Sequence, residues 1–248
     1  MGPAQPSRLQ AEPPPPVDTV QTKPGPDTLV HQYAVMAHAY EPRPIDAVQR
    51  SLDVIIVSLS LIVVGPLCLV VALVLKLTSP RNPILYRGLR VGRSGHLFEM
   101  FKFRTLAPDA EQRLGPYLGP ELTELTSQEV TRLGRFLRAS KLDELPQLYN
   151  VLKGDMSLVG PRPIRPAFFA ELCQEIPQYW QRLVVRPGLT GLAQLRMTRE
   201  MTWAEKLAHD LEYIADRSVS LYLSVILTTA WLLLFRPANR EAGLHRLP

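Results

Sequence analysis

The sequence predicts an α+β protein, mainly helical with a short β-hairpin, that is attached to a membrane. An uncharged, apolar run extends from Val54 to Leu75 and is long enough for a membrane helix. Two short segments of β-like composition flank the turn at residues 92–95, which predicts the hairpin. Much of the chain after residue 130 places apolar residues at helical spacing.

Composition narrows the class of protein without fixing it. The chain has 248 residues, enough for one sizeable domain with appendages, and its 28 Lys and Arg against 23 Asp and Glu give a net charge of +5. That mild basic excess suits an anionic partner, such as a nucleotide, a lipid head group or a nucleic acid. Only Cys68 and Cys173 are present, which argues against a disulfide framework or a cysteine metal cluster and fits a reducing compartment.

Residues 1–46 are predicted to form a disordered, proline-rich tail. They contain the run Pro13–Pro16 and too few apolar residues to build a core. They also lack the basic start and short apolar stretch of a secretory signal peptide. A solvated tail is the favoured interpretation, and a docking role for the proline run is the alternative.

The apolar run at 54–75 has Gly65 and Pro66 at its centre. Proline removes a helix hydrogen bond, so we expect a kink there. The run is therefore either a kinked span or a hairpin that enters and leaves the membrane on one face. Basic residues flank both ends, including Arg50 and Lys76, so two cytoplasmic ends would satisfy the positive-inside rule without a crossing. A buried helix of a soluble protein is a third interpretation.

The predicted hairpin pairs residues 84–87 with residues 96–106. Strand alternation places Lys102 and Arg104 on one face of the second strand. Two cations on one face could bind a phosphate, although an ordinary solvated face has the same pattern. Residues 107–125 are polar and are predicted to form a loop with helical pieces.

Adjacent carboxylates, Asp143 and Glu144, follow a short helix predicted at 131–139. Ser140 could begin the next helix, but Pro146 would then lie in the helix interior. With Asp143 as the N-cap, Pro146 falls in the first turn, where its missing N–H costs nothing. We therefore predict that Asp143 lies at the positive end of a helix, an environment that also attracts phosphate. A plain helix cap is the alternative.

Three arginines are candidates for phosphate contacts near this pair. Arg138 precedes it, and Arg162 follows it between two prolines that restrict the backbone. Arg186 opens a Gly- and Pro-rich turn that extends to Gln194.

The rest of the chain is predicted to be helical. Residues 168–182 form an amphipathic helix that Pro177 should bend or split, and residues 202–216 form a charged helix. Residues 219–235 are uncharged, but 17 residues are at the short limit for a span. Ser and Thr recur at every fourth position there, which favours a helix in the membrane interface or packed on the domain, with a second span as the alternative.

Five motifs together resemble the monotopic polyprenol-phosphate phosphoglycosyl transferases, the bacterial sugar transferase family. They occur in the family's order within residues 48–230, and the proline-rich tail lies outside the resemblance. The motifs are Lys102-Phe103-Arg104-Thr105-Leu106, Leu142-Asp143-Glu144-Leu145-Pro146-Gln147-Leu148, Lys153-Gly154-Asp155-Met156-Ser157, Gly160-Pro161-Arg162-Pro163 and Arg186-Pro187-Gly188-Leu189-Thr190-Gly191-Leu192-Ala193-Gln194.

This resemblance implies a two-step reaction. The Asp of the pair, here Asp143, attacks the β-phosphate of a UDP-sugar, forms a phosphosugar–aspartyl intermediate and releases UMP; undecaprenyl phosphate then accepts the sugar-1-phosphate. Glu144 is implied as the ligand of a Mg²⁺ ion. Lys102, Arg138 and Arg162 are implied as phosphate contacts, and the residues themselves add Arg104 and Arg186 as candidates.

The resemblance also implies an arrangement of the chain at the bacterial inner membrane. Residues 47–78 would form a Pro-broken re-entrant helix, residues 79–217 a cytoplasmic catalytic domain, and residues 218–248 an interfacial helix and tail. The expected partners are a UDP-sugar, undecaprenyl phosphate and membrane lipid, with no nucleic acid; a homodimer is compatible with the sequence. The sugar and the glycan pathway are not specified. A catalytically inactive scaffold of a glycan export system and a two-span membrane protein are the alternatives.

Overall fold

The computed structural model describes residues 41–107, 126–198 and 200–235, together with Val30, Ala37 and Ala110. Most of the predicted tail and of the predicted loop at 107–125 lies outside these residues. The α-helices are α2 (Pro44–Thr78), α5 (Arg132–Ala139), α6 (Gln147–Lys153), α7 (Pro166–Glu175), α8 (Leu192–Arg196), α9 (Trp203–Ala215) and α10 (Val219–Phe235). The 3-10 helices are η1 (Arg93–Gly95), η2 (Leu142–Glu144) and η3 (Tyr179–Val184), and the strands are β1 (Leu85–Val91), β2 (Leu97–Phe103), β3 (Ser157–Val159) and β4 (Gly188–Thr190). The predicted class, mainly helical with a short antiparallel hairpin, is confirmed.

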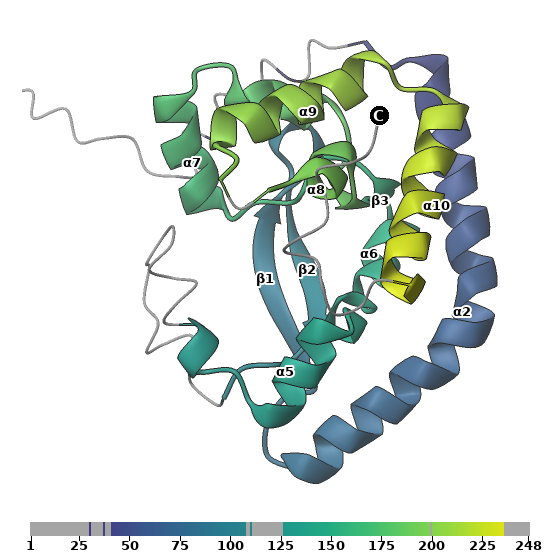
Figure 1. Ribbon diagram of the computed structural model, residues 1–248, viewed down its shortest axis with the longest axis vertical. Helices are drawn as coiled ribbons and strands as arrows, with labels where there is room; N and C mark the ends of the chain where they lie inside the picture. Colours follow the sequence, from purple (N-terminus) through teal and green to yellow (C-terminus); the bar gives the residue numbers. More distant parts are fainter. Residues whose placement is uncertain are drawn as a thin grey trace, which may run out of the picture.

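The apolar run lies within α2, a helix of 35 residues that by length and composition alone could cross a membrane. It begins at Pro44, three residues before the predicted start. Pro66 does not divide it into two helices, because the helix continues through that position. Instead, α2 changes direction near the middle of its length (Figure 1). The expected effect of Pro66 is therefore a bend rather than a break.

Both halves of α2 pack on the rest of the protein, while its middle is exposed. In the first half, Val57 is buried in the main core with residues of α6, α9 and α10. In the second half, Val71 and Leu75 pack against Phe103 of β2 and Leu137 of α5. Between them Val63 is 77% exposed. The helix thus contacts the same folded unit near each of its ends.

Arginines at the start of α2 bind the carboxyl ends of two other helices. Arg50 donates hydrogen bonds to the carbonyl oxygens of Val151 and Leu152 at the end of α6, the latter at 2.6 Å. Arg43 donates to the carbonyl oxygen of Ala215 at the end of α9, at 3.0 Å. Cations are favourable at this negative end of a helix. These contacts fix the first turns of α2 to α9 and to α6, the helix that follows Asp143 and Glu144.

The helix α10 has the bounds that the sequence predicts. It lies beside the first half of α2 (Figure 1), and Tyr222 and Val225 are buried between α10 and the core. The Tyr222 hydroxyl donates a 2.7 Å hydrogen bond to Asp53 Oδ1 of α2. Ser220 and Ser224 of α10 are exposed. The predicted packing of this helix on the domain is therefore present, and its depth in a membrane stays a prediction.

The hairpin β1–β2 is antiparallel, with Tyr86 opposite Lys102. Its second strand ends at Phe103, so the predicted extension to residue 106 is wrong. Asn150 of α6 binds the outer edge of β2: its side chain accepts from the Phe101 N–H at 3.0 Å and donates to the Glu99 carbonyl oxygen at 2.7 Å. A side chain here occupies the place of a neighbouring strand, and it positions β2 against α6.

The strands β3 and β4 form a short parallel pair that the sequence did not predict. Gly160 donates its N–H to the Thr190 carbonyl oxygen at 2.9 Å, and Gly188 donates to the Pro161 carbonyl oxygen at 2.9 Å. A Cβ added to Gly188 would lie 2.1 Å from the Gly160 nitrogen. Only glycine allows this approach of two backbones, which holds the segment around Pro161 in place.

Pro177 separates two helical pieces, as predicted. The first, α7, ends at Glu175, and η3 begins at Tyr179. Arg182 of η3 forms a 2.8 Å ion pair with Asp210 of α9, and both side chains are only 6% exposed. This buried pair joins η3 to α9.

Candidate active site

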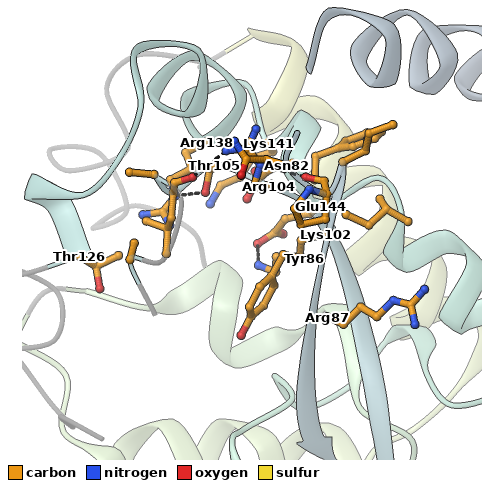
Figure 2. Close-up of a pocket in the computed structure, with 18 of the residues that line it drawn as sticks. Asn82, Tyr86, Arg87, Lys102, Arg104, Thr105, Thr126, Arg138, Lys141 and Glu144 are labelled. Atoms are coloured by element: carbon orange, nitrogen blue, oxygen red, sulfur yellow. Dashed lines mark hydrogen bonds and ion pairs between the residues drawn. The ribbon is translucent and has the colours of Figure 1, made fainter. Parts of the chain in front are cut away.

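A cavity of about 1140 Å³ opens between the hairpin, α5, η2 and the segment after β3. Nine cationic side chains and two carboxylates line it among the described residues. The site therefore favours a ligand with several negative charges. Figure 2 shows Glu144, Lys102, Arg104 and Arg138 gathered around it. The cations are Lys76, Arg87, Arg90, Lys102, Arg104, Arg138, Lys141, Arg162 and Arg165, and the carboxylates are Asp143 and Glu144.

The two carboxylates lie in η2, a single turn of 3-10 helix, and not at the start of an α-helix. The helix α6 begins at Gln147 with Pro146 as its N-cap residue. The prediction that Asp143 caps this helix is therefore wrong. A cap role does not occupy the Asp143 carboxylate.

Lys141 makes the turn that brings η2 into the cavity. Its backbone is left-handed, with φ 60° and ψ 13°, which is uncommon for a residue with a side chain. This turn separates α5 from η2, so that Arg138 and Asp143 both face the cavity. No sequence pattern indicated this turn, since lysine is not a residue that favours the left-handed conformation.

Glu144 is held by cations. Its Oε1 lies 2.8 Å from Lys102 Nζ and 3.7 Å from Arg162 Nη2. Burial opposes the charged form of Glu144, but the attraction of Lys102 and Arg162 outweighs it and lowers the pKa to about 2. Glu144 is therefore a carboxylate at neutral pH, and it links a strand cation to the arginine of the Gly160–Pro163 segment.

Asp143 has a different environment. It lines the cavity but is only 6% exposed, and its buried Oδ1 has no hydrogen-bond partner among the described residues. Burial raises the pKa of Asp143, and Lys102 opposes that rise. A buried oxygen without a partner is costly and calls for an explanation. No structural contact in the described parts of the chain accounts for this oxygen.

Arg138 is positioned by Thr105. Its Nε donates a 2.9 Å hydrogen bond to Thr105 Oγ1, and burial lowers the pKa of the guanidinium while Asp143 raises it. The helix α5 can lie this close because it contains Gly134, where a Cβ would be 2.1 Å from the Thr105 carbonyl oxygen. Sequence patterns singled out Arg138 but not Thr105 or Gly134.

Arg104 and Arg162 also line the cavity, as predicted. The Arg104 Nε donates to the Pro83 carbonyl oxygen at 2.9 Å, which fixes it beside the loop that follows α2. Arg162 is more exposed and reaches Glu144. Its backbone is held by β3 and β4 and by Arg182, which donates to the Arg162 carbonyl oxygen at 3.0 Å.

The structure does not bring Arg186 to this cavity. Its Nε donates a 2.9 Å hydrogen bond to the Gly154 carbonyl oxygen, and it lines a separate small cavity beside Asp53 and Arg93. Burial lowers the pKa of Arg186, and the nearby Arg93 lowers it further. The predicted phosphate contact of Arg186 is therefore not supported. Its segment acts instead through the backbone, by pairing β4 with β3.

The cavity contains further cations and an aromatic residue that the sequence analysis did not select. Tyr86 and Arg90 come from β1, and Arg165 comes from the segment before α7. Strand alternation places Tyr86 and Arg90 on one face of β1, a signal that the sequence held. Their nearness to Arg165 depends on the tertiary fold and could not be read from the sequence.

The donors available to a divalent cation are few. No group of three His, Cys, Asp or Glu side chains comes together within the described ranges. Asp143 and Glu144 are adjacent carboxylates on the cavity wall. Mg²⁺ is commonly bound by one or two carboxylates together with substrate phosphates and water. The residues present therefore fit an ion that a phosphorylated substrate helps to bind, and not one held by protein ligands alone.

The chain is similar to known proteins over most of its length. A family model described as "Bacterial sugar transferase" matches residues 45–236. A UDP-glucose:undecaprenyl-phosphate glucose-1-phosphate transferase from Caulobacter vibrioides is 41% identical over 192 residues, which cover 75% of this chain and 69% of the relative. A UDP-N-acetylgalactosamine-undecaprenyl-phosphate N-acetylgalactosaminephosphotransferase from Aeromonas hydrophila is 37% identical, over 75% of this chain and 43% of the relative.

A shorter relative is matched almost throughout. The exopolysaccharide production protein PSS of Rhizobium leguminosarum bv. phaseoli is 37% identical over 73% of this chain and 92% of its own length. By contrast, the chain spans less than half of the Aeromonas relative. The match at 45–236 begins with α2 and ends just beyond α10, so it includes every helix and strand that forms the cavity. The chain therefore belongs to the bacterial sugar transferase family.

Proposed function

We propose that this protein transfers a sugar-1-phosphate from a UDP-sugar to undecaprenyl phosphate and releases UMP. This would be the initiating step of the synthesis of a polysaccharide or other glycan. The observation that carries the proposal is the unequal pair of carboxylates in the cationic cavity: Glu144 is paired with Lys102, whereas Asp143 has a buried oxygen with no partner in the described part of the chain. Relatives named for this type of transfer support the same reaction.

In the first step, a carboxylate oxygen of Asp143 forms a bond to the β-phosphorus of the UDP-sugar. The bond from that phosphorus to the oxygen shared with the α-phosphate breaks, and UMP leaves with the oxygen and its electron pair. Asp143 reacts as the carboxylate anion, so the step itself removes no proton. Its repulsion from the diphosphate must be screened, and Lys102, Arg138 and Arg162 lie at the cavity to do so.

In the second step, a phosphate oxygen of undecaprenyl phosphate attacks the phosphorus held on Asp143. The bond between that phosphorus and the Asp143 oxygen breaks, which restores the carboxylate and gives the lipid diphosphate sugar. Glu144 keeps its charge throughout, because cations hold its pKa at about 2. Its role is to fix Lys102 and Arg162 around the transferred phosphate.

We propose Mg²⁺ as the cofactor, with Glu144 as its protein ligand. When bound, the ion would supply positive charge to the diphosphate and so favour the departure of UMP. The proposal is supported by the donor set, which offers two adjacent carboxylates on a cavity that suits phosphates. Such an ion would share the Glu144 carboxylate with Lys102, because Lys102 Nζ lies 2.8 Å from Glu144 Oε1.

The proposed location is the cytoplasmic face of the inner membrane, with α2 as a re-entrant helix. Support comes from the packing of α2: Val57 in its first half and Leu75 in its second half are buried against one folded unit. A straight crossing would place the two ends on opposite sides of the bilayer. A bent helix with an exposed apolar middle can enter one leaflet and return, which keeps the cavity at head-group level, where a lipid phosphate lies. We assign α10 to the membrane interface beside it.

The decisive experiment measures UMP release by the purified full chain with a panel of UDP-sugars and a polyprenyl phosphate. We expect release with at least one sugar, and its loss by about 1000-fold or more in Asp143→Asn. Asp216→Asn is the matched control, because Asp216 is exposed at the end of α9. Full activity of Asp143→Asn would exclude it as the nucleophile. No release by the wild type with any sugar would favour the inactive scaffold instead.

A further inference from the structure

The cations of the cavity form two groups that share Arg162. The first group surrounds the carboxylates, where Glu144 contacts Lys102 and Arg162. The second group lies around Arg90, whose electrostatic neighbours are Tyr86, Arg165 and Arg162. The carboxylates of η2 are not among its strongest electrostatic neighbours. We call the part of the cavity wall formed by Tyr86, Arg90 and Arg165 its cationic end.

The cationic end has no acidic partner within the described ranges. No ion pair to a carboxylate is present there for Arg90 or Arg165. Burial lowers the pKa of the Arg90 guanidinium, and Arg165 and Arg162 lower it further, while Tyr86 raises it. Of these three guanidinium groups, that of Arg162 has Glu144 as a carboxylate partner, whereas Arg90 and Arg165 have none within the described ranges, so a bound anion would offset their repulsion. The arrangement is that of a phosphate site rather than of a structural ion pair.

Gly88 leaves the space that this arrangement occupies. It lies between Tyr86 and Arg90 on the same face of β1. A Cβ at this position would be 2.5 Å from the Tyr86 hydroxyl and 2.9 Å from Arg90 Nη1. The two side chains therefore lie across the glycine. In Figure 2 the Tyr86 ring extends away from the contact between Lys102 and Glu144, so it lines the cavity beyond the carboxylates.

The chemistry of the proposed reaction requires a second phosphate position. In phosphoryl transfer the attacking and leaving oxygens lie roughly in line on opposite sides of the phosphorus. If Asp143 attacks the β-phosphorus, the α-phosphate must depart on the far side. In the return step Asp143 is the leaving group, so the phosphate of the lipid carrier must attack from that same far side. One position thus receives two different phosphates in turn.

We propose that Arg90 and Arg165, together with Tyr86 and the shared Arg162, form this second phosphate subsite. It holds the phosphate of UMP as UMP leaves and then the phosphate of the lipid carrier. Arg162 bridges the subsites, because it reaches Glu144 on one side and the Arg90 group on the other. The inference rests on the proposed function and adds to it a place for both phosphate monoesters.

The test measures binding and activity separately, with the full chain in detergent. Binding of UMP, uridine and geranyl phosphate is measured by calorimetry for the wild type, Arg90→Gln, Arg165→Gln and Gly88→Ala. The control is Arg135→Gln, which removes the same charge from an exposed position of α5 outside the cavity. Gly88→Ala removes no charge. The Cβ would meet the Tyr86 hydroxyl and Arg90 Nη1, which are the ends of side chains and can shift, so this variant should still fold.

We expect each arginine variant to weaken the binding of UMP and of geranyl phosphate by about tenfold, the loss of roughly one charged hydrogen bond, and to leave uridine binding unchanged. Gly88→Ala should weaken the same two phosphates by displacing Arg90. The KM for both substrates should rise in parallel. A loss confined to UMP would assign the subsite to the nucleotide and overturn its use by the carrier.

Binding equal to that of Arg135→Gln in all three variants would overturn the subsite itself. Failure of the proposed function would look different: the wild type would release no UMP, while the phosphate-binding measurements, which need no turnover, would still decide whether the subsite exists.

Discussion

Lys102 Nζ lies 2.8 Å from Glu144 Oε1, and this contact distinguishes two carboxylates that are neighbours in the chain. Glu144 is kept charged by its cations, with a pKa of about 2. Burial raises the pKa of Asp143, which receives only a longer-range attraction from the same lysine. A strand residue thus gives the two carboxylates different environments, and Asn150 holds its strand β2 against α6.

The acid side of the pH–rate profile should report the ionisation of Asp143. The nucleophile must be charged, so UMP release should fall as the pH drops through the pKa of Asp143, which burial places above its ordinary value of 3.8. Lys102 opposes that rise. Lys102→Gln should therefore move the acid limb to higher pH, in addition to lowering the rate.

Arg104→Gln is the control for this shift. Arg104 is a cation of the same cavity, but it is not among the groups that act most strongly on the pKa of Asp143. Its loss should lower the rate without moving the acid limb. An acid limb at the same pH in Lys102→Gln and the wild type would show that the limb belongs to another group.

The stability contribution of Glu144 should depend on pH in a defined direction. Its pKa is lowered from 4.5 to about 2 in the folded protein, so its stabilising effect is complete above about pH 4.5 and is lost as the pH falls through about 2. Glu144→Gln should lower the free energy of unfolding by about 3 kcal/mol near neutral pH, the equivalent of this shift. The difference from the wild type should shrink between pH 4.5 and pH 2.

Denaturant unfolding at several pH values measures this difference. Glu171→Gln, at an exposed position of α7, serves as the control and should change stability little at any pH. A constant difference between Glu144→Gln and the wild type over the whole range would mean that packing, not charge, explains the loss.

The elements and site residues that the sequence predicted correctly are those that depend on local properties of the chain. The bounds of α10 and the split at Pro177 follow from local properties, namely an uncharged run and a missing backbone donor. The candidates Lys102, Arg138 and Arg162 do come together at one cavity with Asp143. Periodicity and backbone constraints depend on residues that are close together in the sequence, so they can be predicted from the sequence alone.

What sequence patterns could not supply depends on contacts between distant segments. The left-handed backbone of Lys141 inserts the turn η2 and removes Asp143 from the predicted cap. The pairing of Gly160 with Thr190 turns the second Gly-rich motif into a scaffold, which leaves Arg186 away from the cavity. The strand pair has no local signature, because a parallel strand is specified only by its partner, and lysine at residue 141 does not indicate a left-handed turn.

Asn150 offers a sharp test of how the fold positions Lys102. The side chain satisfies the Phe101 N–H and the Glu99 carbonyl oxygen at the edge of β2. Asn150→Ala leaves both groups without this partner and should cost about 2–4 kcal/mol. Asn150→Asp can still accept from the Phe101 N–H. It replaces the amide donor by a negative oxygen that faces the backbone carbonyl oxygen of Glu99 and lies near the Asp155 carboxylate. It should be destabilised at least as strongly near neutral pH.

Thermal unfolding and UMP release measure these effects together. Gln178→Glu makes the same change from amide to carboxylate at an exposed position and should be near neutral. Because Asp155 and the Glu99 carbonyl oxygen repel only the charged form of a new aspartate, Asn150→Asp should recover part of its stability as the pH is lowered. Wild-type stability of Asn150→Ala would contradict the role of this side chain in holding β2.

Two glycines should respond to alanine in opposite ways. In α2, a Cβ at Gly65 would meet nothing within 4 Å, so Gly65→Ala should raise stability by up to about 1 kcal/mol through helix propensity and leave UMP release unchanged.

In α5, a Cβ at Gly134 would lie 2.1 Å from the Thr105 carbonyl oxygen, which is backbone and cannot move aside easily. Gly134→Ala should push α5 away from Thr105 and release Arg138, whose Nε is bound to the Thr105 hydroxyl. We expect a lower melting temperature and a fall in kcat/KM of about tenfold or more, the loss of one charged contact to the transferred phosphate. Equal melting temperatures and rates for the two variants would show that the approach of α5 to Thr105 does not position Arg138.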